Sequence, residues 1–190
     1  MLNSRMMKLF YVAVLVLVTV CAHGQGVNPN WKQELKVNLN KFLQCTAGGE
    51  KAACTNFIGE SLKVVYKVDD FYNKKEGRYM TASEITEYLK TSRSWSSLGV
   101  SYDQHVLNRA GELANARKAV VAVYNNSAGI GHIVLITPGE MTTSGSWGLK
   151  VPAAASFFTT EPAKSFTDKA LSFAFSKQML KDVTIYSRKY

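Results

Sequence analysis

The stretch AACTNFIGESLKVVYKV, residues 52–68, decides how this chain is expected to fold. Its apolar residues recur every three or four positions, at Ile58, Leu62 and Val65. Because this spacing puts them on one face of a helix, we predict a helix from Thr55 to about Val68 that packs on a core. Cys54 stands at the mouth of the helix, one turn before Ile58, and is expected to point to the same side.

Two side chains in and after this stretch are candidates for chemistry. The N–H groups and partial positive charge of a helix start favour the thiolate of Cys54, which is the attacking species. In a second stretch, GHIVLI at residues 131–136, every residue after His132 is apolar, so both faces of a strand there would be apolar. This pattern therefore predicts a strand covered on both faces, which would hold the imidazole of His132 rigidly, as a general base requires.

Residues 1–24 are expected to be a signal peptide. Arg5 and Lys8 precede an apolar run, residues 9–20. That run is shorter than the ~20 residues of a membrane span, and the small residues Ala22 and Gly24 suit cleavage. An uncleaved anchor is the alternative, and lipidation of Cys21 fits less well because Val20 precedes it. We expect a secreted or periplasmic protein with no stable membrane insertion after cleavage.

The rest of the chain, residues 25–190, has the length of a single domain, without a long linker or an internal repeat. Loss of Arg5 and Lys8 with the leader would lower the formal net charge from +9 to +7. The basic residues are scattered, so they suit an anionic envelope surface, or simple solvation, better than a nucleic acid.

Two cysteines and two histidines remain after the leader: Cys45, Cys54, His105 and His132. In an oxidising compartment the two cysteines also fit a disulfide that closes a short loop, which is the main alternative to a reactive Cys54. None of the short ligand spacings of zinc modules is present, so no metal is expected. His105 is expected to be a surface or helix-end residue.

The remaining segments give helices first and strands afterwards. We predict helices at 31–43, 82–90 and 103–116, a Ser/Gly-rich loop at 95–102, and strands at 118–124, 133–136, 147–151 (extended by 152–156) and 182–187. Thr81 and Glu84 form a capping box before the second of these helices. The strands at 118–124 and 133–136 should pair as an antiparallel hairpin. This order is typical of an α+β domain.

The order of a cysteine at a helix start, helices, and a strand that opens with Gly-His resembles the NlpC/P60 and CHAP group of papain-like cysteine peptidases and amidases. The residues that carry the resemblance are ACTNF at 53–57, similar to the Cys-x-x-Phe helix start of that group, and GHIVLI at 131–136, similar to its Gly-His strand. Residues 146–152 also look like the strand that follows the histidine. The implied fold has N-terminal helices packed on an antiparallel sheet.

The resemblance implies a hydrolase, without a cofactor, that cleaves amide or peptide bonds in peptidoglycan stem peptides. Cys54 would be the nucleophile, His132 the general base, and a backbone N–H at the helix start would stabilise the oxyanion. The third residue that orients the histidine in such enzymes has no evident match. Candidates after Ile136 are Glu140, Ser144, Ser146 and Ser156, with Ser156 preferred for its strand position, and a backbone carbonyl is an alternative.

Two other functions are consistent with the same residues. One is a non-catalytic cell-wall-binding protein of the same fold, with Cys45 and Cys54 joined in a disulfide. The other is a different papain-like thiol hydrolase that acts on proteins or amidated small molecules.

Overall fold

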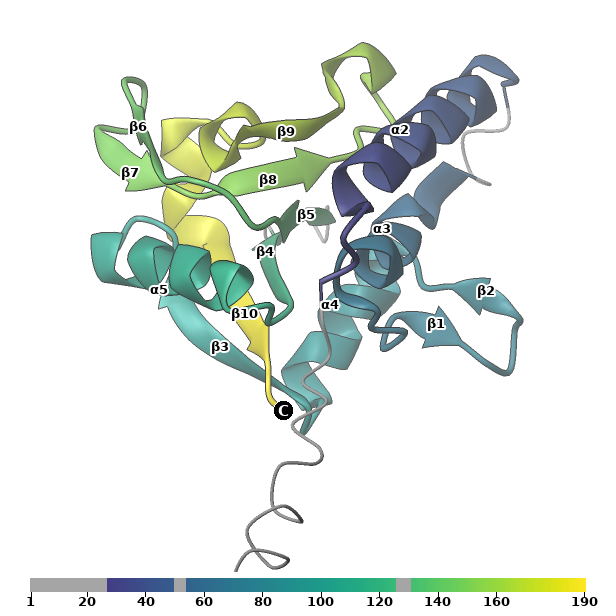
Figure 1. Ribbon diagram of the computed structural model, residues 1–190, viewed down its shortest axis with the longest axis horizontal. Coiled ribbons are helices and arrows are strands. Elements are labelled where there is room, and N and C mark those ends of the chain that lie inside the picture. Colours follow the sequence, from purple (N-terminus) through teal and green to yellow (C-terminus); the bar gives the residue numbers. More distant parts are fainter. Residues whose placement is uncertain (1–26, 50–53, 126–130) are drawn as a thin grey trace, which may run out of the picture.

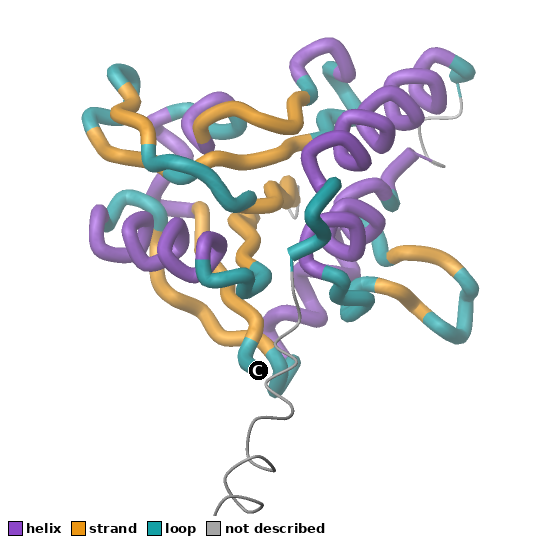
Figure 2. Tube along the Cα trace, viewed as in Figure 1, coloured by secondary structure: helices purple, strands orange, loops and turns teal. Residues whose placement is uncertain are grey.

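The computed structural model describes residues 27–49, 54–125 and 131–190. The predicted signal peptide, residues 1–24, lies outside the described residues. Within them, no helix has the length and apolar character needed to cross a membrane. Figures 1 and 2 show an antiparallel sheet with α2, α3 and α4 gathered on one side of it and α5 against β3 and β10. The chain is therefore mixed α+β, as predicted.

The two cysteines lie close to the adjoining ends of two helices, one at the end of α2 and the other shortly before α3. Helix α2 (Trp31–Ala47) runs four residues beyond its predicted end, so Cys45 lies in its last turn rather than in a loop. Helix α3 (Phe57–Tyr66) begins two residues later than predicted, and Cys54 precedes it in a separate 3-10 turn. It ends at Tyr66 because Lys67 takes the left-handed backbone conformation, with φ of 56°.

The next two helices follow the sequence prediction closely. Helix α4 (Ala82–Thr91) begins with the predicted capping box, in which the Glu84 backbone N–H donates to Thr81 Oγ1 over 3.3 Å and the Thr81 N–H donates to Glu84 Oε2 over 2.6 Å. Helix α5 (Gln104–Asn115) is capped by Asp103, which accepts a hydrogen bond from the backbone N–H of His105.

The main sheet has six antiparallel strands in the order β3-β10-β4-β5-β8-β9. Their bounds are β3 (Trp95–Val100), β4 (Val120–Asn125), β5 (Gly131–Ile136), β8 (Ala153–Ser156), β9 (Phe166–Ala170) and β10 (Val183–Arg188). Two-stranded sheets are formed by β1 (Tyr72–Asn73) with β2 (Arg78–Tyr79) and by β6 (Thr142–Ser144) with β7 (Leu149–Val151). The short 3-10 helices are η2 (Pro162–Lys164), η3 (Leu171–Phe173) and η4 (Lys177–Asp182).

The predicted hairpin is confirmed, with β4 and β5 paired in antiparallel register from Val120 opposite Ile136 to Asn125 opposite Gly131. All residues of β5 after His132 are buried, as expected of a strand covered on both faces. The predicted last strand is also present as β10, and it lies inside the sheet, between β3 and β4, although both of these strands come well before it in the sequence.

Two strand predictions were wrong. Residues 95–102 do not form a loop, because most of them form β3, which gains backbone hydrogen bonds from β10. A register shift beside Gly99, whose φ is +130°, lets this Ser-rich strand follow its partner. Residues 147–156 are not one continuous strand: β7 pairs with β6 in a separate sheet, and only β8 joins β5.

Helices α3 and α4 both pack on β5, and this contact brings their N-terminal ends to the start of that strand. One buried hydrogen bond ties helix to strand: Tyr66 donates its hydroxyl to the carbonyl oxygen of Ile136 over 2.7 Å. The fold thereby places the segment that carries Cys54 beside the strand that carries His132.

Candidate functional site

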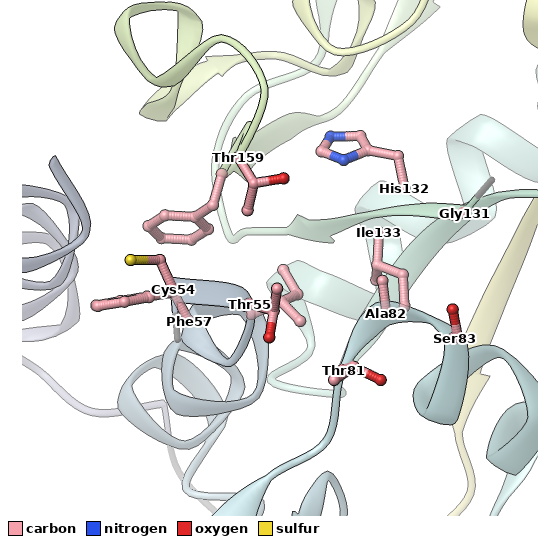
Figure 3. A pocket seen from close by; sticks show the side chains of 12 residues that line it. Cys54, Thr55, Phe57, Thr81, Ala82, Ser83, Gly131, His132, Ile133 and Thr159 are labelled. Carbon is pink, nitrogen blue, oxygen red and sulfur yellow. The ribbon is translucent and has the colours of Figure 1, made fainter. Parts of the chain in front are cut away.

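A pocket of about 240 Å³ lies where the starts of α3, α4 and β5 meet the segment that follows β8. Cys54, Thr81, His132 and Thr159 each come from a different one of these four segments, and all line the pocket. Figure 3 shows Cys54 and His132 on opposite sides of it. The two candidate catalytic residues, 78 positions apart in the sequence, therefore border the same pocket.

The sulfur of Cys54 is bonded to that of Cys45 in a disulfide, with a Cα–Cα distance of 5.9 Å. Only 1% of Cys54 is exposed, and in Figure 3 its sulfur points away from the imidazole of His132. The prediction that Cys54 presents a thiol does not describe this oxidised state, in which the residue has no thiol to ionise. The structure thus contains the disulfide, which the sequence analysis gave as the main alternative to a reactive Cys54.

Cys54 also does not lie at the N-terminal end of the helix, where it was predicted. Helix α3 begins at Phe57, with Asn56 as its N-cap, so the cysteine lies outside the first helical turn. The field of a helix falls off within that turn. Stabilisation of a Cys54 thiolate by the helix start is therefore weaker than the sequence indicated.

His132 is the second residue of β5, and its imidazole has a polar partner at one nitrogen and an aromatic ring stacked on one face. Its Nε2 lies 2.7 Å from the Oγ of Ser156, within hydrogen-bonding distance. The ring of Phe158 stacks on it with a centroid distance of 4.5 Å and an interplanar angle of 15°, and Phe175 contacts it edge-on at 5.8 Å. Because Nε2 is engaged with Ser156, Nδ1 is the nitrogen left for a second partner.

The strand register explains why Ser156 reaches His132. Ser156 is paired with Val134 across the β5–β8 ladder, and His132 is two residues before Val134 on the same face of β5. The histidine and the serine are thus diagonal neighbours on adjacent antiparallel strands, close enough for polar side chains to meet. Ser156 is fully buried and does not line the pocket, so it can orient the imidazole but cannot itself reach a bound molecule.

Burial lowers the pKa of His132 to about 4. The imidazole is therefore neutral at pH 7, and a neutral ring can accept a proton, although a ring with so low a pKa is a weak base. Conversion of a neighbouring group to an anion would raise this pKa, because an opposite charge favours the protonated ring.

Apart from the imidazole of His132, the described side chains that line the pocket are hydroxyl-bearing or apolar, and none of the lining side chains carries a formal charge at neutral pH. The hydroxyls belong to Thr55, Thr81, Ser83 and Thr159. Such a lining can hydrogen-bond the N–H and C=O groups of an uncharged amide. Among the described residues, no group of three or more His, Cys, Asp or Glu side chains could hold a metal ion.

The structure separates the predicted residues into two sets. Cys54, His132 and Ser156 belong to one region, whereas His105 is exposed at the start of α5 and contributes nothing to the pocket. Sequence reasoning missed Phe158 and Phe175, which enclose the imidazole. Only the FF pair at 157–158, directly after Ser156, gave a signal for the first of them.

No protein-family model and no curated protein sequence matches the chain.

Proposed function

We propose that this protein is a papain-like thiol hydrolase that cleaves amide or peptide bonds in peptidoglycan stem peptides when its Cys45–Cys54 disulfide is reduced. The observation that supports it is one pocket lined by both Cys54 and His132, with the imidazole engaged through Nε2 by Ser156. A cysteine shortly before a helix, a histidine on a strand and an orienting residue on the neighbouring strand are the arrangement that the resemblance to the NlpC/P60 and CHAP group implies.

Reduction comes first, because Cys54 is bonded to Cys45. A dithiol reductant supplies two electrons and two protons: the disulfide becomes two thiols and the reductant becomes a disulfide. Release from Cys45 then allows the Cys54 side chain to turn toward His132 across the pocket. The imidazole takes the thiol proton through Nδ1, and the resulting thiolate raises the pKa of the ring.

Hydrolysis then follows in two balanced steps. The thiolate attacks the carbonyl carbon, a thioester forms, the C–N bond breaks, and the protonated imidazole of His132 gives its proton to the leaving amine. A water molecule, deprotonated by the same imidazole, then attacks the thioester carbonyl carbon. The C–S bond breaks, the carboxylic acid product leaves, and the imidazolium returns its proton to the Cys54 thiolate. Backbone N–H groups before and at the start of α3 lie beside Cys54 in the sequence and would stabilise the oxyanion.

The test is digestion of purified peptidoglycan with and without a dithiol reductant, with new amine ends counted by labelling and mass spectrometry. We expect release by the reduced wild type and by Cys45→Ser without reductant, and none by Cys54→Ala or His132→Ala, whose folding is checked by circular dichroism. If Cys54→Ala is active and Cys45→Ser is inactive, the nucleophile is Cys45 and the assignment of Cys54 is wrong. Absence of release from the reduced wild type and Cys45→Ser, on walls of several peptide chemistries, would reject the hydrolase.

The disulfide favours a second candidate function, a non-catalytic cell-wall-binding protein. An exported protein keeps such a bond in an oxidising compartment, and its basic excess suits an anionic wall. Co-sedimentation of the oxidised protein with insoluble peptidoglycan tests this role. Binding that persists in Cys54→Ala and weakens with salt, together with absent hydrolysis under reduction, would support it over the enzyme.

A further inference from the structure

Ser156, the last residue of β8, and the two residues that follow it make contacts toward both His132 and the helices near Cys54. Ser156 engages Nε2 of His132, and Phe158 stacks on the face of the same ring. Phe157, between them, turns the other way: its ring lies 5.4 Å from that of Phe42 on α2 and 6.1 Å from that of Phe57 on α3. The segment thus connects the imidazole to the two helices that adjoin the disulfide.

The backbone of this segment is itself fixed. The N–H of Phe158 donates to the Oγ of Ser165 over 2.8 Å, which ties the residue to the segment that leads into β9. Phe157 is buried, with 8% of its surface exposed. Because the backbone of Phe158 is held by Ser165 and its neighbour Phe157 is buried, the Phe158 ring can restrain the imidazole of His132.

A single hydrogen bond leaves an imidazole able to tilt about the bond that holds it. A parallel aromatic ring on its face removes that freedom, because tilting would break the stacking contact. The contact also excludes water from that face of His132, in agreement with the direction of its pKa shift. Ser156 and Phe158 together therefore restrain both the edge and the plane of the ring.

We propose that Phe158 is a positioning residue for His132, and that Phe157 joins it to α2 and α3 so that the imidazole keeps a fixed place relative to these two helices. The catalytic part of this proposal rests on the function proposed above. The restraint on the ring does not, so the two can fail separately.

The neighbours of His132 given by the structure are uncharged, so the titration of its imidazole can be interpreted without a charged partner. Among the described residues, Ser156 is the hydrogen-bond partner of the ring, Phe158 and Phe175 are the aromatic rings packed against it, and Tyr124 is its cross-strand partner on β4. None of them carries a charge at neutral pH. A change in the titration of His132 on replacement of Phe158 therefore reports on the stacked ring and not on the loss of a charged partner.

The first measurement is the NMR titration of the His132 ring in the purified protein. Phe158→Leu should raise its pKa by about one unit toward the ordinary value, since one face of the ring becomes hydrated. The separate variant Phe158→Tyr keeps an aromatic ring, so His132 should titrate in it as in the wild type. Phe173→Leu, a change at an exposed phenylalanine, is the matched control and should have no effect. Phe158→Met replaces Phe158→Leu if the latter does not fold.

An unchanged His132 titration in the folded Leu or Met variant would overturn the proposal. The second measurement is hydrolysis of a stem peptide by the reduced proteins, where Phe158→Leu should lower kcat about tenfold or more with little change in KM. If the pKa moves but no protein hydrolyses the peptide, the restraint stands and the proposed function fails. If the wild type hydrolyses it and Phe158→Leu has an unchanged kcat, the positioning role fails and the function stands.

Discussion

The replacement Cys45→Ser separates the structural role of the disulfide from its effect on the pocket. The two cysteines are nine positions apart, and the chain-entropy model gives about 2.6 kcal/mol of stabilisation for closing a loop of that length. Serine is close in size to the half-buried cysteine it replaces, so the loss of packing is small. We expect the free energy of unfolding to fall by about 2–3 kcal/mol.

Thermal unfolding measures this change directly. For a domain of this length, 1 kcal/mol corresponds to roughly 2–4 °C in Tm, so Cys45→Ser should unfold about 5–10 °C below the oxidised wild type. The reduced wild type should unfold close to the variant. Ala47→Ser, at an exposed position in the same turn of α2, introduces a serine without removing a bond and is the matched control.

Thiol counting in denaturant completes the experiment, with the chain from residue 25 onward so that Cys21 does not contribute. The oxidised wild type should show no titratable thiol, and Cys45→Ser should show one. Equal Tm values for the oxidised wild type, the reduced wild type and Cys45→Ser, together with two titratable thiols in the protein as isolated, would refute the disulfide and the reasoning built on it.

Three further predictions concern the imidazole and the start of α4. Ser156→Ala removes the hydrogen bond to Nε2 of His132, and under the proposed hydrolase function it should lower kcat of the reduced protein on a stem peptide about tenfold or more, so an unchanged kcat would contradict an orienting role. The pKa of His132 is about 4 in the folded protein and about 6.5 when unfolded, so the unfolded state binds the proton more readily and stability should fall, on the order of 3 kcal/mol, as the pH drops from 6.5 to 4. Urea unfolding at a series of pH values should show this loss, and His132→Gln should reduce it. Glu84 has its pKa lowered to about 2, first by the hydrogen bond from Arg78 and then by the Thr81 backbone, so its stabilisation is present above pH 4.5 and disappears toward pH 2. Glu84→Gln should cost about 1 kcal/mol at pH 7, mainly through the weakened pair with Arg78, since glutamine can still accept from the Thr81 N–H, while Glu87→Gln on the exposed face should cost little in the same urea assay.

Helices and the central hairpin of this protein were predictable because their signals are local. The capping box of Thr81 and Glu84 uses residues three positions apart, and the apolar stripe of α3 repeats within each turn. The buried run after His132 predicted a strand covered on both faces for a similar reason, since its pattern is complete within six residues. The candidate residues Cys54, His132 and Ser156 were also selected from such local contexts.

The sequence by itself therefore determined the α+β class, most of the helices, and the set of candidate side chains for a site. Only the tertiary structure decided that β10 enters between β3 and β4, that Ser156 reaches His132 across the β5–β8 ladder, and that Cys54 is bonded to Cys45. The physical reason is that local spacing fixes which way a residue faces within its own element. Strand neighbours, ring stacking and sulfur pairing depend instead on which distant elements pack together, and that depends on the burial of the whole core.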